Sequence, residues 1–328
     1  MPRAPVAFVS HGGLGDLVLH ADAIRQHLAS GGARADRYVA AAPLCALAEL
    51  LLPGTVWTPL APAADEPSET TTVTLRWFTT VSAAGPAPRT ELIADRELYD
   101  AFERARATGP QALPEFFARG LSMRAIVCRS WGFVEDQDFI RLETVGRARA
   151  FGGEPYILIA NGADRPPPVR TRQTKELPRG LFAACAQQLM TRAPGHRIVE
   201  VGRERDGLPV PGVLDLREQT TLAELVDLVA HADAILSPEG GIAHLAAALR
   251  KPAVVLTGPT SEAHYGHRLH AYLRSGICRP CAWSTPDWYA ACPLDIGAAC
   301  MSAFDPVTVA GIVAASASGR RAGAAAGR

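Results

Sequence analysis

The stretch that decides the fold is LSPEGGIAHLAAALRKPAVVLTGPT, residues 236–260. A short apolar run at 234–237 predicts a strand, and the Pro and Gly residues at 238–241 end it. Apolar residues then recur at helical spacing, namely Ile242, Leu245, Ala246 and Leu249. A second apolar run follows Lys251. The order strand, turn, helix, turn, strand is the repeating unit of a parallel α/β sheet.

The turn between this strand and helix has the composition of a ligand site. Gly240 and Gly241 allow a ligand to approach the backbone closely, and the free N–H groups and positive dipole end of the new helix face it. Glu239 would repel a phosphate, but its carboxylate can accept hydrogen bonds from sugar hydroxyls. His244 lies one helical turn beyond Gly240 and faces the same mouth. A plain β–α turn with a capping glutamate would also explain the pattern.

This stretch resembles the nucleotide-sugar site of the heptosyltransferase family. Gly241, His244 and the turn at 258–260 match the family pattern. Glu239 stands where the family usually has Asp, and Gly240 stands where it usually has Thr. The resemblance runs along nearly the whole chain and implies the GT-B fold, in which two Rossmann-like α/β domains face each other across a cleft. It also implies an inverting transferase with ADP-heptose as its sugar donor.

The chain opens with another glycine-rich turn, in VAFVSHGGLGDLVL at residues 6–19. A dinucleotide-binding turn would need a glycine where Val18 stands, and Asp16 would repel a pyrophosphate, so we exclude a nicotinamide or flavin fingerprint. A carboxylate at a helix start is stabilised as an anion and can act as a base or simply as a cap. The turn is similar to the opening Gly-Asp motif of the heptosyltransferases. This implies that Asp16 is the catalytic base and that Gly13 and Gly15 bind substrate.

Length and composition bound the class of protein. The chain has 328 residues, enough for two domains, and 48% of them are hydrophobic. Basic and acidic residues number 33 each, so the formal net charge is zero and nothing favours a nucleic-acid partner. We predict an acceptor-binding domain at 1–150 and a nucleotide-sugar-binding domain at 151–317 that contains a Cys-rich loop at 278–300. The low-complexity tail at 318–328 is predicted to be disordered.

The chain enters a strand almost at once, and it contains no run of about 18 apolar residues. We therefore expect no signal peptide, no membrane span and a cytoplasmic location, and the resemblance implies a bacterial enzyme. Peripheral membrane contact and oligomer formation are left open by the sequence.

A polar, proline-rich loop at 161–178 follows the first strand of the second half. Its cations and hydroxyls suit a diphosphate, although a solvated basic loop would have the same composition. The spacing of Thr171 and Lys175 resembles the family's phosphate-contacting loop, which implies that both contact the diphosphate. By position in the family, Glu204 is implied to bind the ribose and Thr220 to lie under the base. A surface charge is the alternative for Glu204.

Four of the seven cysteines lie close together near the end of the chain. Their spacing, C-x2-C-x10-C-x7-C, suits a tetrahedral metal site. We predict a structural iron or zinc ion bound by Cys278, Cys281, Cys292 and Cys300. Disulfides are the weaker explanation in a chain without a secretion signal, and a loop without metal stays open. The segment also resembles the family's Cys-rich loop, which holds iron in some relatives.

These patterns predict an inverting glycosyltransferase that moves a sugar, heptose from ADP-heptose, to an acceptor hydroxyl. Asp16 would take the acceptor proton. Thr171, Lys175 and the helix that starts near Gly240 would stabilise charge on the leaving diphosphate, so no catalytic metal is required. The acceptor, whether a glycan, a protein or a small molecule, is not indicated. Two alternatives remain: a sugar-nucleotide epimerase or hydrolase on the same fold, and a non-catalytic metal- or redox-sensing protein.

Overall fold

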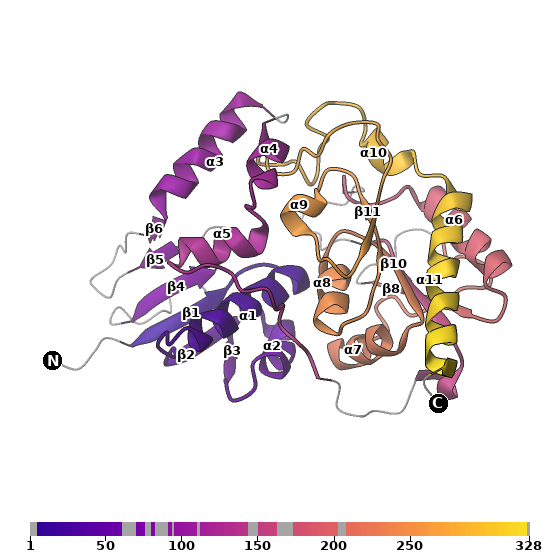
Figure 1. Cartoon of the computed structure of the whole chain (residues 1–328), viewed down its shortest axis with the longest axis horizontal. Coiled ribbons are helices and arrows are strands. Elements are labelled where there is room, and N and C mark those ends of the chain that lie inside the picture. The colour runs from indigo at the N-terminus through magenta and orange to yellow at the C-terminus, as the bar shows by residue number, and fades with distance from the viewer. Residues whose placement is uncertain are drawn as a thin grey trace.

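A computed structural model describes the chain at residues 5–60, 70–75, 80–82, 91–93, 95–109, 112–143, 150–162, 173–202 and 208–326. Within these residues the chain builds two six-stranded sheets, each at the centre of one half of the molecule. The two halves lie side by side, and helices from both halves meet between the sheets (Figure 1).

The first sheet has the strand order β3-β2-β1-β4-β5-β6. Its first four strands are parallel, and β5 and β6 pair in antiparallel fashion. The strands are β1 (Val6–Ser10), β2 (Arg37–Ala40), β3 (Trp57–Pro59), β4 (Thr71–Leu75), β5 (Thr80–Ser82) and β6 (Glu91–Ile93). The helices of this half are α1 (Leu14–Ala29), the 3-10 turn η1 (Ala42–Leu44), α2 (Cys45–Leu51), α3 (Arg96–Thr108), α4 (Leu113–Ala118) and α5 (Met123–Ser130).

The second sheet has the order β12-β11-β10-β7-β8-β9 and is parallel throughout. Its strands are β7 (Tyr156–Ala160), β8 (Arg197–Val201), β9 (Leu214–Asp215), β10 (Ala234–Pro238), β11 (Val254–Thr257) and β12 (Ala271–Arg274). Its helices are η3 (Ala150–Gly153), α6 (Arg179–Arg192), α7 (Leu222–His231), α8 (Gly241–Ala248), α9 (Glu262–Tyr265), α10 (Ala299–Ser302) and α11 (Pro306–Ala326). The predicted α/β class with two Rossmann-like halves is confirmed.

Both sheets share the doubly wound strand order, in which the chain reverses direction across the sheet once. The reversal lies between β1 and β4 in the first sheet and between β7 and β10 in the second. Ligands of such sheets bind outside the carboxyl ends of the strands at this reversal. The topology therefore selects the turns after β1, β7 and β10 as the places for a site.

The halves meet through the N-terminal ends of α1 and α8, which pack against each other. A Cβ atom on Gly241 would lie only 2.9 Å from the Cβ atom of Leu14, and one on Gly15 would lie 2.8 Å from the His244 ring. Only glycine permits this approach. The apolar core continues across the seam, because buried residues of both helices belong to one cluster.

The segment after α5 runs along the same seam and is tied to both halves. The Asp22 carboxylate, fully buried on α1, accepts a hydrogen bond from the backbone N–H of Ile140 at 2.8 Å. Two residues later, the N–H of Leu142 donates to the carbonyl of Ala248 in α8 at 2.9 Å. This segment therefore links the helix behind the first turn to the helix behind the second.

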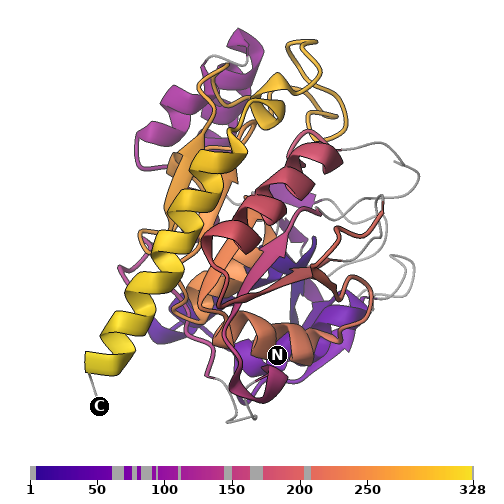
Figure 2. The same ribbon diagram turned by 90° about the vertical axis from the view of Figure 1, so that its right-hand side faces the viewer.

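The end of the chain is helical, and the prediction of a disordered tail at 318–328 is wrong. We expected the closing helix to end near Ala315, whereas α11 continues to Ala326. Alanine and arginine, which make up most of this segment, are strong helix formers. The helix α11 as a whole packs on α6 (Figure 2). The boundary predicted at 150/151 adjoins residues 144–149, which lie outside the described part, and it stays a prediction.

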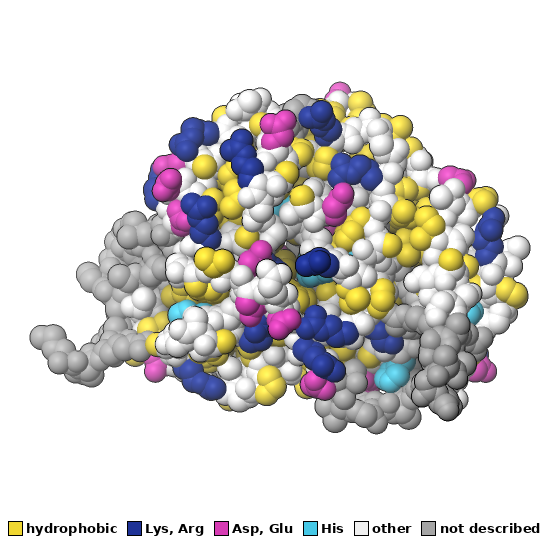
Figure 3. Space-filling view, in the orientation of Figure 1, with side chains coloured by type: hydrophobic (Ala, Val, Ile, Leu, Met, Phe, Trp, Pro, Cys, Tyr) yellow, Lys and Arg dark blue, Asp and Glu magenta, His cyan; other side chains and the backbone are white. Residues whose placement is uncertain are grey.

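The surface is mixed in charge on the face shown in Figure 3, where basic and acidic side chains are interspersed. This agrees with the formal net charge of zero. Among the described residues, no helix combines the length and the hydropathy that crossing a bilayer requires.

The glycine contact at the seam leads to a stability prediction. Gly241→Ala would force a methyl group against Leu14 and should lower the free energy of unfolding by about 1–3 kcal/mol, as overpacking does. Urea denaturation measures this change. Gly180→Ala on α6 is the matched control, because nothing lies within 4 Å of its added Cβ. That control should be neutral or stabilising, and equal losses in the two variants would contradict the close contact.

Candidate functional site

The predicted ligand turns occupy the reversal points of the two sheets. The Gly-Asp turn follows β1, the loop that carries Lys175 follows β7, and the Glu239–Gly240 turn follows β10. Because α1 and α8 touch at their N-terminal ends, the structure brings the first turn against the third. Residues far apart in the sequence thus share one location.

Asp16 caps the start of α1. Its Oδ2 atom accepts a hydrogen bond from the backbone N–H of Gly13 at 3.0 Å. The carboxylate lies over Gly12, whose φ of +120° favours glycine and where a Cβ would collide with it. The cap that the sequence left open as an alternative is therefore present. A capped carboxylate keeps further lone pairs, so it can still accept a proton.

A buried polar chain of Lys175, Glu239 and His244 lies at the N-terminal end of α8, which we call the α8 mouth. Lys175 Nζ lies 3.1 Å from Glu239 Oε2, and His244 Nε2 lies 3.3 Å from Glu239 Oε1. Glu239 is only 5% exposed. Burial alone would raise its pKa, but the Lys175 ammonium and His244 lower the pKa to about 2. Glu239, which we predicted to bind sugar hydroxyls, is thus a sealed anion whose partners here are a lysine and a histidine.

Two further histidines extend this chain into the protein. Nδ1 of His244 lies 2.7 Å from Nε2 of His267. His270 bridges the backbone, with Nε2 2.8 Å from the Ala243 carbonyl and Nδ1 accepting from the N–H of Ala253 at 3.2 Å. Burial lowers the pKa of His267 to about 2 and that of His270 to about 4. Both rings are neutral at ordinary pH.

The loop that carries Lys175 is held by the Cys-rich loop. The N–H of Thr174 donates to the Tyr289 carbonyl at 2.9 Å, and its hydroxyl donates to the Trp288 carbonyl at 2.8 Å. Lys175 Nζ lies 6.0 Å from the centre of the Trp288 ring. Sequence reasoning missed Thr174, because a buried threonine in a polar loop has no distinctive pattern.

The Cys-rich loop also holds the turn at 258–260. The backbone N–H groups of Cys281 and Ala282 both donate to the Pro259 carbonyl at 2.8 Å. A Cβ on Gly258 would lie 2.9 Å from Cys300 Sγ, so the loop packs directly on the turn. The same loop therefore contacts both the segment after β7 and the segment after β11.

All seven cysteines are free thiols, and Cys281 and Cys300 are buried. Burial, together with the neighbouring thiols of the loop, raises the pKa of both to about 12. Burial would raise the pKa of Cys292, but backbone N–H groups at 294–298 lower it, and such donors suit a thiolate. Within the described residues, no three His, Cys, Asp or Glu side chains are arranged to hold a metal ion. Four thiols are a donor set that zinc and iron prefer, and metal binding by these residues stays a prediction.

The structure does not test the predicted roles of Thr171, Glu204 and Thr220. Thr171 and Glu204 lie outside the described residues. Thr220 precedes α7, whose N-cap is Thr221. Sequence analysis also missed Glu200, a buried carboxylate on β8 that binds Arg179 Nη2 at 3.0 Å.

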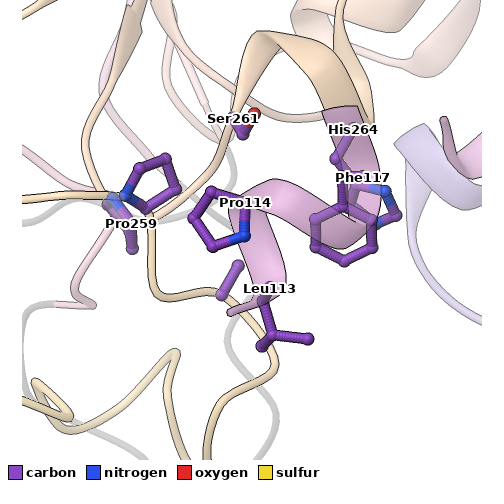
Figure 4. Close-up of a pocket in the computed structure, with 8 residues that line it drawn as sticks. Leu113, Pro114, Phe117, Pro259, Ser261 and His264 are labelled. Atoms are coloured by element: carbon purple, nitrogen blue, oxygen red, sulfur yellow. The ribbon is translucent and has the colours of Figure 1, made fainter. Parts of the chain in front are cut away.

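A small apolar pocket lies beside these elements, where α4 faces the turn at 258–261. It encloses about 190 Å³, open solvent included. Figure 4 shows Phe117 and Pro114 of α4 opposite His264 and Pro259. None of the predicted site residues lines it.

Comparison with protein families matches the part of the chain that contains Lys175, Glu239 and His244. Residues 135–285 match the model of "Glycosyltransferase family 9 (heptosyltransferase)". The chain is 32% identical over 122 residues to lipooligosaccharide heptosyltransferase 2 of Haemophilus influenzae, covering 34% of this chain and 33% of the relative. It is 29% identical over 140 residues to lipopolysaccharide heptosyltransferase 1 of Pseudomonas aeruginosa, covering 41% and 38%. The matched segments thus span little more than a third of these relatives.

Solved structures share the fold over nearly the whole chain. The dodecameric iron-containing heptosyltransferase TibC, solved with ADP-D-beta-D-heptose, superposes with a TM-score of 0.61 at 17% identity, covering 96% of this chain and 76% of TibC. The E. coli ADP-heptose LPS heptosyltransferase II superposes with a TM-score of 0.60 at 14% identity, covering 97% and 99%. The two-domain GT-B arrangement is therefore confirmed.

The buried histidines predict sensitivity to acid. Burial lowers the pKa of His264 to about 3, of His267 to about 2 and of His270 to about 4, from an ordinary value of 6.5. The unfolded chain therefore binds more protons below pH 6.5, and stability present above that pH is lost on acidification. Each ring contributes up to about 1.4 kcal/mol per pH unit. The melting temperature should fall clearly between about pH 7.5 and pH 5.

His264→Phe supplies the matched control for this prediction. His264 stacks on Phe117 with ring centres 3.7 Å apart, so phenylalanine keeps the apolar contact and removes one titrating ring. The melting temperature of the variant should depend less steeply on pH than that of the wild type. A wild-type melting temperature that is constant over this range would show that the buried rings do not govern stability.

Proposed function

We infer that the chain is a member of the heptosyltransferase family, glycosyltransferase family 9, whose model matches residues 135–285. From that premise we propose that it moves heptose from ADP-heptose to an acceptor hydroxyl with inversion at the anomeric carbon. One observation supports this proposal most. The Gly-Asp turn of the first sheet lies against the α8 mouth of the second, where Lys175 and Glu239 meet at 3.1 Å. A donor on one half and an acceptor on the other would then meet at a single place.

The proposed chemistry uses a base on one side and cations on the other. Asp16 takes the proton of the acceptor hydroxyl as its oxygen attacks the anomeric carbon. The bond from that carbon to the diphosphate oxygen breaks, and the electron pair leaves with ADP. Lys175 and the N–H groups at the start of α8 stabilise the charge that develops there. The scheme assigns no step to a divalent cation.

The remaining predicted residues are given binding roles in this scheme. Gly13 and Gly15 line the acceptor side, and Gly240 and Gly241 allow the diphosphate to approach the backbone. By resemblance, Thr171 would contact the diphosphate, Glu204 the ribose and Thr220 the base. In this proposal the enzyme acts in a bacterial cytoplasm, and its acceptor class, membrane contact and self-association stay open to experiment.

We further propose that the Cys-rich loop holds one structural iron or zinc ion. Cys278, Cys281, Cys292 and Cys300 would supply four thiolates, and such a closed shell leaves no position for substrate. The spacing of the four cysteines and the backbone N–H groups around Cys292, which suit a thiolate, support this assignment. When bound, the ion would order the loop that holds Thr174 and Pro259.

Transfer is tested by incubating the protein and ADP-heptose with a lipopolysaccharide core glycan, a serine-rich peptide or a hydroxylated small molecule. We expect ADP release together with a heptosyl mass gain on one acceptor. Asp16→Asn keeps an oxygen that can accept from Gly13 but removes the base, so turnover should fall by about 10²–10⁴-fold while ADP still binds.

Two outcomes of the transfer experiment would contradict the proposal. Free heptose released without any acceptor would indicate a hydrolase. Turnover of Asp16→Asn equal to that of the wild type would leave Asp16 as a helix cap only. A buffer with a chelator is included, because the scheme predicts that transfer persists in it.

The metal prediction is tested by elemental analysis of protein purified without chelator. We expect about one equivalent of iron or zinc, because four thiolates bind such ions tightly. Cys292→Ser should lose the metal and melt at a lower temperature, whereas Cys45→Ser, outside the loop, should retain it. Less than about a tenth of an equivalent in the wild type, with four titratable thiols in the loop, would refute a stable site.

A further inference from the structure

The polar chain at the α8 mouth contains several titratable groups in direct contact with one another. It runs from Lys175 to Glu239, His244 and His267 through contacts of 3.1, 3.3 and 2.7 Å. Glu239 is 5%, His244 2% and His267 9% exposed. A carboxylate and two imidazoles in line, largely shielded from water and most exposed at His267, can hold and move a proton.

The hydrogen bonds determine where the protons reside without ligand. His244 Nε2 faces an ionised carboxylate, so this nitrogen carries a hydrogen. A neutral His244 then has a bare Nδ1, and the contact at 2.7 Å requires the hydrogen on Nε2 of His267. Nδ1 of His267 is left bare. His270 does not take part, because the backbone carbonyl and N–H that it bridges hold it in one neutral tautomer.

Charged and titratable groups surround the His244–His267 pair and the elements packed against it. They are Lys175 of the loop before α6, Glu239 of the turn before α8, Asp16 of α1, Arg124 of α5, His264 and Tyr265 of α9, and His267 and His270 after α9. Without ligand, the Lys175 ammonium balances the Glu239 carboxylate. Arg124 opposes a positive charge on His267, whereas Glu239 favours one on His244. An added proton is therefore best placed on His244.

A diphosphate at the α8 mouth would upset this balance. Its two negative charges compete with Glu239 for the one ammonium group, and Glu239 is too deeply buried to be compensated by water. The neighbouring imidazole can supply the missing positive charge. The geometry needed is already present, since His244 Nε2 lies 3.3 Å from Glu239 Oε1.

We propose that binding of the ADP-sugar is coupled to the uptake of one proton by the His244–His267 pair. This inference rests on the proposed function, in which Lys175 and α8 bind the diphosphate. A proton from solvent enters at Nδ1 of His267, and the hydrogen on its Nε2 passes to Nδ1 of His244. The product is an imidazolium at His244 between Glu239 and a neutral His267. No electrons are transferred, and the proton leaves when ADP leaves.

In this arrangement His267 is a positioning residue for His244. It accepts the Nδ1 hydrogen of the imidazolium, which would otherwise be a buried donor without a partner. A merely structural His267 would support the fold equally well with or without ligand, so proton uptake on binding separates the two roles.

The test is titration calorimetry of the whole protein with ADP-heptose and no acceptor, at about pH 7.5 in PIPES, HEPES and Tris. ADP-heptose has no group that titrates near this pH, so ligand ionisation does not contribute. The observed enthalpy plotted against the ionisation enthalpy of the buffer gives the number of protons taken up. We expect about one per bound donor.

Three variants locate the proton. His267→Phe keeps a ring against Phe139 and should bind ADP-heptose with uptake reduced towards zero. His267→Gln can rotate its amide to accept the Nδ1 hydrogen and should restore uptake. His231→Gln, on the far end of α7, should behave as the wild type.

The outcomes separate this inference from the proposed function. Binding of ADP-heptose by the wild type with no dependence on buffer would overturn the inference and leave the transferase proposal intact. Uptake that survives in a folded His267→Phe protein would remove His267 from the relay. No binding of ADP-heptose at all would overturn the donor assignment and, with it, the inference.

Discussion

The contact between Gly15 and Gly241 is the constraint on which the site depends. The ends of α1 and α8 approach so closely that a single methyl group has no room, with a would-be Cβ on Gly241 at 2.9 Å from Leu14. Each glycine also belongs to the turn that follows a strand at the reversal of its sheet. The same contact therefore packs the two halves together and places the predicted acceptor turn beside the predicted donor turn.

Local patterns predicted most of the fold. Alternation of apolar runs with turn residues and helical spacing predicted β10, α8 and β11 nearly to the residue, because short-range sterics and burial decide these elements. The tail was mispredicted for a compositional reason. Low complexity suggested disorder, whereas the alanine-rich composition of this segment favours a helix.

The candidate site could be predicted in its residue types but not in its partnerships. Glu239, His244 and Lys175 were identified from turns that suit a ligand, yet nothing in the chain indicates that Lys175 pairs with a residue 64 positions away. His267 was missed because a histidine after a short helix has no periodic signature. Its role arises only from a contact with the His244 ring, which helix α8 positions. Pairings of this kind depend on the packing of whole elements, which local spacing does not encode.

The Cys-rich loop connects two walls of the site through its backbone carbonyl and N–H groups. It accepts hydrogen bonds from Thr174 on one side and donates to Pro259 on the other. Since these contacts use main-chain atoms, they depend on the path of the loop rather than on particular side chains. Whatever orders the thiols therefore also orders the segments before α6 and after β11.

The apolar core that the two halves share at the seam couples their unfolding. Buried side chains of both halves form one apolar cluster, and the segment at 139–142 is bonded to α1 at one end and to α8 at the other. Separating the two halves along this line would expose apolar area to water. The two halves should melt as one cooperative unit, and either half produced alone would be prone to aggregate. Any exchange of one half between related proteins must carry the seam with it.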